Sequence, residues 1–442
     1  SSVTDNWKSS QNTSEYFIKQ GREYLQKTIE YLEKTNVDSA DDIENMTVAE
    51  LKNYFKTGGT DEVKENPVLM ADNDEQYVLG SHIERKSIQK IKFVKIKRSQ
   101  LPESAWDVSS DENETIWAWT EDAGRILKIG AESRIYANSD CSSLFSDYTE
   151  VKTIEFNDMF DTARVTNMSH MFSTCKNLVR LDVAKFNTVL VTDMSSMFCE
   201  CKNLTELDVT GFDTGSVTDM SSMFYECKNL MKLDVTGFDT GRVTDMSWMF
   251  AGCKNLMKLD VTGFDTDRVT DMSGMFDSCE NLKELDVTGF DTGRVTNMSD
   301  MFGGCENLKE LDVTRFDTSH VMDMAGMFCD CENFTELDVT GFDTGCVTNM
   351  SWMFGGCKNL MKVDVTGFNT GCVTDMSSMF ERCENLMELN VTGFCTTFVT
   401  EMSRMFYGCK NLIELDGSEN IKYKYNIADT KDMFEGCEKL EI

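Results

Sequence analysis

Histidine is nearly absent from this sequence, with three examples among 442 residues: His82, His170 and His320. The three are far apart in sequence, so they do not suggest a catalytic pair. The chain also lacks a Gly-rich phosphate loop, a nucleophile-elbow motif and a zinc-ligand spacing. We therefore expect a noncatalytic protein.

Positive charge and long apolar runs are also scarce. Lys and Arg number 43 against 76 Asp and Glu, for a formal net charge of −33, so we expect no nucleic-acid partner. No apolar run reaches the roughly 18 residues of a membrane span. The sequence begins Ser1-Ser2-Val3-Thr4, without a start methionine or an apolar signal core, and is expected to be a trimmed piece of a longer protein.

The sequence is dominated by one repeat of 26 residues. The copy that begins at Val217 reads VTDMSSMFYECKNLMKLDVTGFDTGR, and the next copy begins at Val243 with nearly the same residues. Ten copies begin at Val165, Val191, Val217, Val243, Val269, Val295, Val321, Val347, Val373 and Val399. An unbroken period of this length predicts a solenoid, in which each coil contacts only its neighbours.

Each copy predicts one strand, one short helical arm and two turns. Leu230, Leu233 and Val235 have the spacing of a leucine-rich-repeat strand, whereas Met220, Met223 and Phe224 have three- and four-residue spacing typical of a helical turn. Asp219 is placed to cap that turn. The predicted fold class is an α/β solenoid: a leucine-rich-repeat-type stack of about eleven to twelve coils with parallel strands, forming a continuous sheet about 50 Å across.

Two segments precede the stack. Residues 1–65 are predicted to be a helical N-terminal segment, because Phe17, Leu25 and Ile29 fall at helical spacing and residues 47–50 form a capping box. Residues 66–137 are predicted to be a β-rich capping module, with short apolar runs around Phe93 and Trp117 separated by turns. The solenoid itself is assigned to residues 138–442, including irregular coils at both ends.

Seventeen cysteines are present, and eleven share one repeat position. This column comprises Cys175, Cys201, Cys227, Cys253, Cys279, Cys305, Cys331, Cys357, Cys383, Cys409 and Cys437. We interpret it as buried thiols that act as small hydrophobic side chains. A bridge between Cys346 and Cys372, one period apart on a predicted loop, is the one disulfide that the spacing suggests.

Three columns of polar residues lie at or near the strand: an Asn, an Asp and a Thr in most copies. A recurring Asn at its start, such as Asn229, predicts a structural amide ladder. An Asp between the inward Leu and Val predicts an outward row of carboxylates, whose repulsion neighbouring Thr hydroxyls would soften. This row is either an acidic groove for a cationic or hydroxyl-rich partner or a solvated face that keeps the sheet soluble. Calcium coordination between adjacent coils is a narrower alternative; no other cofactor is expected.

The remaining outward strand positions change from copy to copy, as in Met231-Lys232 and Lys283-Glu284. A fixed scaffold with variable outward pairs is typical of a repeat protein that displays a binding surface. The candidate binding residues are therefore Asp208, Asp234, Asp260, Asp286, Asp312, Asp338, Asp364, Thr236, Thr262, Thr288, Met231, Lys232, Met257 and Lys258.

The repeat Val-Thr-Asp-Met-Ser-x-Met-Phe-x-x-Cys-x-Asn-Leu-x-x-Leu-Asp-Val-Thr-Gly-Phe-Asp-Thr closely resembles that of BspA-like leucine-rich repeat surface proteins. The segment from Trp106 to Trp119 also looks like the stretch that often leads into these repeats. The resemblance covers roughly residues 100–442. It implies a bacterial protein displayed at the cell surface or secreted, with adhesion to host or microbial macromolecules.

Two functions stay open at this point. The first is a noncatalytic adhesion or recognition protein that binds a protein or glycan ligand through the exposed sheet. The second is a structural or assembly scaffold, with a cytoplasmic location as its alternative address, that self-associates through residues 1–60 or docks by a solenoid edge. The cysteine-rich, proline-poor composition leaves room for the second.

Overall fold

A computed structural model describes residues 67–70, 79, 83–110, 112–422 and 428–441. The chain divides into two units, residues 1–60 and residues 61–442. Because the described residues begin at 67, the predicted helical segment 1–65 lies outside them. Within the described ranges, no helix is long and apolar enough to cross a membrane.

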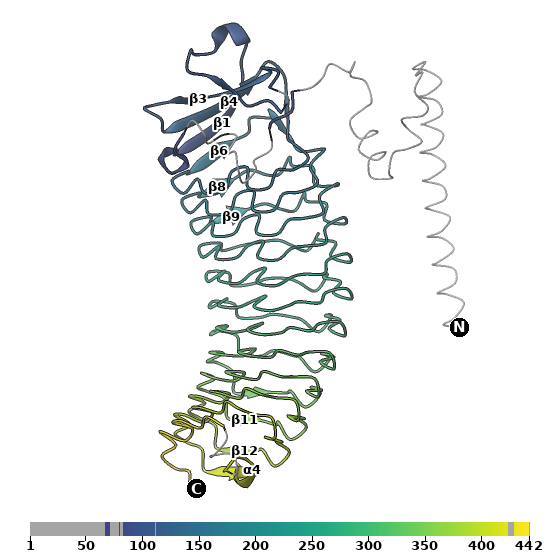
Figure 1. The fold of residues 1–442 in the computed structure, drawn as a ribbon, viewed down its shortest axis with the longest axis vertical. Helices are drawn as coiled ribbons and strands as arrows, with labels where there is room; N and C mark the ends of the chain where they lie inside the picture. The colour runs from purple at the N-terminus through teal and green to yellow at the C-terminus, as the bar shows by residue number, and fades with distance from the viewer. Residues whose placement is uncertain (1–66, 71–78, 80–82, 111, 423–427, 442) are drawn as a thin grey trace, which may run out of the picture. The chain divides into compact units, whose positions relative to one another are not determined.

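The described chain starts with a β-rich segment. Its elements are η1 (Arg85–Ser87), β1 (Lys90–Lys95), η2 (Arg98–Gln100), β2 (Trp106–Asp107), β3 (Ile116–Glu121), β4 (Ile126–Ala131) and β5 (Ile135–Tyr136). Strands β2, β3 and β4 are antiparallel, whereas β1 lies parallel between β4 and β6 (Thr153–Glu155). This places the β-rich segment edge to edge with the strands of the first coils (Figure 1).

Strand β1 also covers the core of the first coil. Ile91 and Phe93 are fully buried, and the Phe93 ring lies 4.9 Å from the Phe160 ring and 6.2 Å from the Phe145 ring. An uncovered first coil would expose its apolar core, so β1 caps the solenoid at this end.

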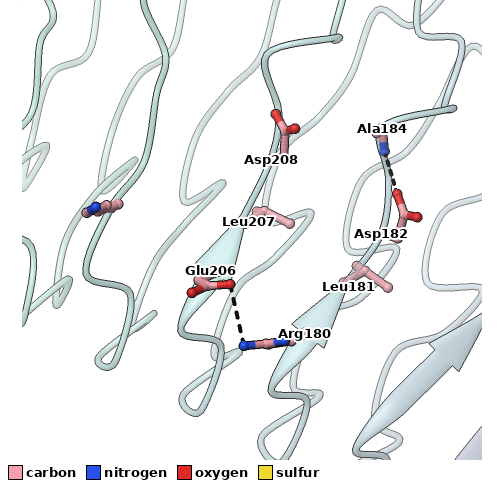
Figure 2. A pocket seen from close by; sticks show the side chains of 8 residues that line it. Arg180, Leu181, Asp182, Ala184, Glu206, Leu207 and Asp208 are labelled. Carbon is pink, nitrogen blue, oxygen red and sulfur yellow. Dashed lines mark hydrogen bonds and ion pairs between the residues drawn. The ribbon is translucent and has the colours of Figure 1, made fainter.

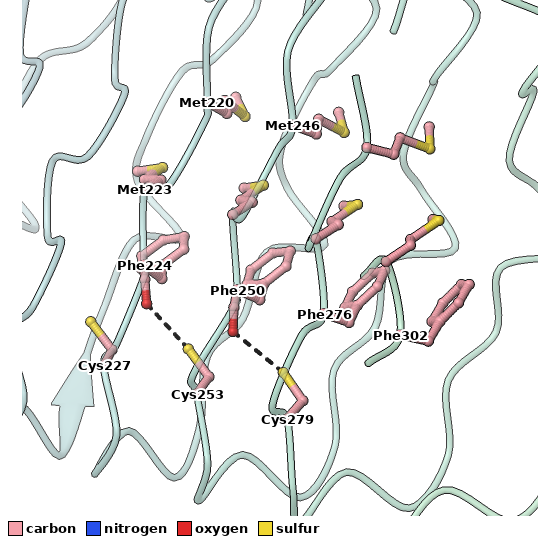
Figure 3. Packing of buried hydrophobic residues seen from close by; sticks show 14 of the residues in the cluster. Met220, Met223, Phe224, Cys227, Met246, Phe250, Cys253, Phe276, Cys279 and Phe302 are labelled. Atoms are coloured by element: carbon pink, nitrogen blue, oxygen red, sulfur yellow. Dashed lines mark hydrogen bonds between the residues drawn. The ribbon is translucent and has the colours of Figure 1, made fainter. Parts of the chain in front are cut away.

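A column of stacked phenylalanine rings runs through the coils (Figure 3). Ring centroids of successive coils are 5.4–5.8 Å apart and the planes are tilted by at most 13°. The column comprises Phe145, Phe172, Phe198, Phe224, Phe250, Phe276, Phe302, Phe328, Phe354, Phe380, Phe406 and Phe434. Methionine, valine and leucine columns surround it, and the coils therefore share one continuous core.

The return arm of each copy, Val217–Cys227 in the copy quoted above, contains no helix. Met220, Ser222, Phe224 and Glu226 donate their backbone N–H groups to carbonyl oxygens of the next coil over 2.7–3.1 Å. The intervening N–H groups of Met223, Tyr225 and Cys227 bond to the carbonyl three residues back. The predicted helical arm is therefore wrong: three- and four-residue spacing arises here from consecutive turns.

Backbone conformation explains why a helix cannot form. Two residues of the arm, Ser222 and Glu226, have φ of 55° and 58°, in the left-handed region that no right-handed helix tolerates. The equivalent positions in the next copies are Trp248 and Gly252, then Gly274 and Ser278, and all four also have positive φ. Asp219 consequently caps a turn rather than a helix, accepting the N–H of Ser221 at 2.9 Å.

The strands on the opposite side of each coil form several short sheets. After β7 (Phe160–Asp161), which pairs with β5, they are β8 (Arg180–Leu181), β9 (Glu206–Leu207), β10 (Glu336–Leu337), β11 (Lys362–Val363), β12 (Glu388–Asn390) and β13 (Glu414–Asp416), followed by α4 (Ser418–Lys422). Pairing joins β8 to β9, β10 to β11 and β12 to β13.

The predicted continuous sheet is wrong in the middle of the stack. Beyond the bridge between Glu206 and Lys232, no strand pairing occurs until β10. The ladder that does run without a break lies on the return arm, where bridges link Asp140, Asn167 and each equivalent residue through Asp429. The described coils are thus held together at the arm and are open on part of the strand side.

The cysteine column is buried, as predicted, and it also makes hydrogen bonds. Each thiol donates to a phenylalanine carbonyl of the preceding coil, for example Cys253 Sγ to Phe224 O and Cys279 Sγ to Phe250 O, both at 3.3 Å (Figure 3). Cys437, in the last described coil, is half-buried. Cys346 and Cys372 are exposed free thiols.

The predicted asparagine ladder is confirmed in two forms. Asn229 Nδ2 donates to Asn203 Oδ1 at 3.1 Å, an amide-to-amide bond between coils. Asn281 and Asn307 instead donate to backbone carbonyl oxygens of the preceding coil at 2.8 Å. Both forms link neighbouring coils, so this column is structural.

Candidate functional site

The outward side chains of the strands and of the turn that follows each of them form one surface, which we call the strand face. At its first coils, Arg180 and Glu206 pair across neighbouring coils at 3.8 Å (Figure 2). The Asp182 carboxylate accepts the N–H of Ala184 at 3.2 Å. The strand face therefore begins with the carboxylate position that recurs from Asp208 to Asp364 in the following coils.

Each aspartate of this row holds the turn that follows it. Asp260 Oδ1 accepts the N–H of Thr262 at 3.1 Å and its hydroxyl at 2.7 Å. The equivalent bonds recur at Asp208, Asp234, Asp286, Asp312, Asp338 and Asp364. In the ninth copy Asn390 makes the same two bonds through its amide oxygen. Turn geometry therefore needs the Oδ1 acceptor and not the charge.

These hydrogen bonds also fix the charge of the row. The hydroxyl of Thr236, followed by its N–H, lowers the pKa of Asp234, and the charges of Asp208 and Asp260 oppose this only weakly. The pKa values of the other six carboxylates, from Asp208 to Asp364, are lowered by the same two donors. Threonine bonding thus outweighs like-charge repulsion, and the row is ionised at neutral pH.

Eight of the predicted residues line one groove of about 610 Å³, which we call the methionine groove. They are Asp208, Asp234, Asp260, Thr236, Met231, Lys232, Met257 and Lys258. Met231 and Met257 are 50% and 55% exposed, a high value for apolar side chains. The structure therefore places a flexible apolar surface directly beside the aspartate row.

A second groove, of about 890 Å³, continues from the first over the coils without strand pairing, and we call it the open groove. Asp260 and Lys258 belong to both grooves. Asp286, Asp312, Asp338, Thr262 and Thr288 line the open groove as well. Leu311 is partly exposed there, whereas the equivalent Leu259 and Leu285 are 3% and 8% exposed.

Asp364 is the one predicted residue that lines neither groove, although it is exposed and bonded to Thr366 like the others. Among the described residues, no group of three or more His, Cys, Asp or Glu side chains is arranged to hold a metal ion.

A second variable surface lies on the return arm and was missed by the sequence interpretation. At the left-handed position of the arm, Trp248 lies over Gly274 of the next coil, where a Cβ atom would come within 2.5 Å of the indole. Trp352 at the equivalent position is 38% exposed. The sequence does contain a signal for this surface. In the motif Met-Ser-x-Met-Phe, the residue x differs between copies, whereas the residues on either side of it are nearly constant.

Asp277 on this arm gives a pH-dependent prediction. Burial raises the pKa of Asp277 to about 6, and the charge of Asp300 adds to the effect. A carboxyl with a raised folded-state pKa destabilises the fold when ionised, so this loss is present above about pH 6 and disappears below about pH 4. For Asp277→Asn we expect a gain of about 1 kcal/mol at pH 8, reduced for solvent screening, and almost none at pH 4.

Thermal unfolding at the two pH values measures this gain. Asp267→Asn, at an exposed turn, is the matched control and should leave the melting temperature unchanged at both. Equal stabilisation by Asp277→Asn at pH 4 and pH 8 would contradict the assignment of the effect to ionisation.

Comparison with known families matches three overlapping stretches of the chain, residues 139–258, 244–342 and 330–442, to the family described as "Mycoplasma protein of unknown function, DUF285". No curated protein matches. Among solved structures, a chain of the complex titled "Crystal structure of TLR13-ssRNA13 complex" is similar at 14% identity and a TM-score of 0.25. The similarity covers 70% of this chain and 39% of that one.

Proposed function

The chain belongs to the DUF285 family of Mycoplasma proteins, whose function is unknown, and we propose that it is a noncatalytic binding protein that acts through the strand face. Its partner is a protein or glycan, recognised by the aspartate row and by the variable residues beside it. The family description points to a bacterial protein. Display at the cell surface or secretion is part of the proposal and is supported by the resemblance of the repeat to BspA-like surface proteins.

One observation carries this proposal: a charged row of fixed geometry lies beside side chains that change from coil to coil. From Asp208 to Asp364 the row presents one ionised carboxylate per coil, and the Oδ1 bonds hold each in the same orientation. The exposed methionines are unlike the polar side chains that a purely solvated face needs. A row of equal charges with variable apolar neighbours favours recognition over a merely solubilising role.

Neutralising the row tests the proposal. We expect Asp260→Asn, Asp286→Asn and Asp312→Asn together to weaken binding about tenfold or more, because charged contacts are lost while the turns keep their acceptor. The natural Asn390 shows that the amide makes the same bonds. The measurement is saturable binding of the labelled chain to arrays of matrix proteins, mucin glycans and whole cells.

The matched control makes the same charge change on the return arm. Asp219, Asp245 and Asp271 hold equivalent turns there, and Asn297 and Asn349 already stand at this position in other copies. The triple Asp→Asn variant at those residues should retain binding. Binding that is equally weak in both variants, or absent from every array for the unmodified chain, would refute the strand face as the binding surface.

A further inference from the structure

We propose that the partner element that occupies the strand face is a basic amphipathic α-helix, lying along the solenoid axis. Its Lys and Arg side chains pair with the aspartate row from Asp208 to Asp312, and its apolar side chains contact the methionine groove. This inference rests on the proposed binding function and adds the chemistry and the shape of the partner.

The charge of the aspartate row favours a cationic occupant. The row is ionised at neutral pH, and threonine donors hold the pKa of each carboxyl below its usual value. Each Oδ1 is already engaged by a threonine, and the aspartates are exposed, so Oδ2 is available to an incoming donor. Arg and Lys are the side chains that pair with carboxylates most strongly.

The coil spacing selects a helix over an extended strand. Phenylalanine rings of successive coils are 5.7–5.8 Å apart from Phe172 to Phe354, and each coil presents one aspartate. Paired backbones of neighbouring coils are about 4.8 Å apart, so the coil spacing lies between about 4.8 Å and the ring spacing. An α-helix advances about 5.4 Å per turn, within this range, so side chains at i and i+3 or i+4 can meet successive coils. Same-side residues of a strand are about 6.7 Å apart, outside this range, and lose register along the row.

Strand addition is also disfavoured by the open groove itself. Met257 and Lys283 still share one long hydrogen bond, from Lys283 N–H to Met257 O at 3.4 Å. The peptide groups of residues 258–260 and 284–286 have no strand pairing and belong to neighbouring coils, so an added strand would have to enter between those coils. The return arms of the same coils stay bonded, as in Gly252 N–H to Asp277 O at 2.7 Å. Separating the coils would break that ladder, whereas a helix can lie on the surface without disturbing it.

The methionines supply the apolar half of the interface. Met231 and Met257 are unbranched, half exposed and adjacent to the aspartate row within one groove. Methionine-rich surfaces adapt to amphipathic helices of different sequence. Lys232 and Lys258 lie between the methionines and the row, and they confine the positive side chains of the partner to the aspartate side.

The probe is a synthetic helix of about 18 residues, long enough to span the five coils from Asp208 to Asp312, with Lys along one stripe and Leu along the adjacent one. Its two controls have the same composition apart from the change stated: one has the Lys positions scrambled around the helix, and the other carries a central proline. Fluorescence anisotropy at about 0.1 M salt gives the affinity, and circular dichroism follows helix formation.

We expect the amphipathic peptide to bind about tenfold or more tightly than either control and to gain helicity on binding. Replacing the five aspartates from Asp208 to Asp312 with Asn should weaken it about tenfold or more, and Met231→Ser with Met257→Ser should weaken it to a smaller extent. Equal affinity for the scrambled peptide, or binding without gained helicity, overturns the inference.

The two proposals fail differently. If the arrays yield a ligand that is lost on aspartate neutralisation while the helical peptide does not bind, the strand face is the binding surface and the helical partner is wrong. If the peptide binds equally well to the return-arm triple variant and to the strand-face variant, non-specific charge attraction explains the binding, and the inference is overturned.

Discussion

Replacing Phe276 with alanine is expected to lower the free energy of unfolding by about 3–5 kcal/mol. Phe276 is fully buried and stacks on Phe250 and Phe302, with both centroid distances 5.8 Å. The substitution removes a ring from the middle of the column and leaves a cavity between coils bonded at their arms, which limits how far the site can collapse.

Because each coil contacts only its neighbours, the loss should be local before it is global. Hydrogen exchange of backbone amides in residues 250–302 should accelerate most, alongside a lower melting temperature by calorimetry. Phe398→Ala is the matched control, since that ring is 64% exposed, and its effect should stay within about 0.5 kcal/mol. A similar loss for both variants would contradict the role of the stacked column.

The second large effect concerns thiol reactivity. The eleven buried cysteines are Cys141 and the ten column members from Cys175 to Cys409. They should react with a thiol reagent about a thousandfold or more slowly than the exposed Cys346, Cys372 and Cys395, because a buried thiol reacts only after local opening. Burial raises the pKa of Cys175 to about 12 and that of Cys279 well above the usual value, which leaves little thiolate at pH 8. Three fast thiols, three intermediate ones and eleven protected ones are the expected native pattern.

The titration is made on the reduced protein, followed by mass spectrometry of labelled peptides. All seventeen thiols should react in denaturant. The double variant Cys346→Ser and Cys372→Ser should reduce the fast class to Cys395 alone. Rapid native labelling of a peptide from the cysteine column would show that the coils open far more readily than their bonding indicates.

The repeat made much of the architecture predictable. A period of 26 residues with inward Leu, Val, Met, Phe and Cys gave the coils and their shared core, and the outward position of the aspartate row followed from strand alternation. The row was also expected to gain hydroxyl donors, which Thr236 and its equivalents provide. Columns of equivalent residues were readable because every coil repeats the same environment.

The errors have physical causes. Spacing alone cannot distinguish a helix from consecutive turns, and left-handed φ at a residue such as Glu226 leaves no mark in its own identity. The clue was the glycine at the same column in other copies, Gly252 and Gly304. The loss of strand pairing was not predictable, since copies with and without it share the same inward leucine and valine residues. The open groove lies over the coils that lack the pairing.

The position-by-position bonding between coils has a consequence for how such a chain can change over generations. Each bond joins fixed repeat positions of neighbouring copies, as Thr240 is joined to Asp265, 25 residues on, and Asn229 to its counterpart Asn203. Recombination between two copies of the gene segment that adds or removes 26 codons restores every such bond at the new junction. The length of the surface, and the order of charged and apolar side chains along it, can therefore change by whole coils while the fold stays the same.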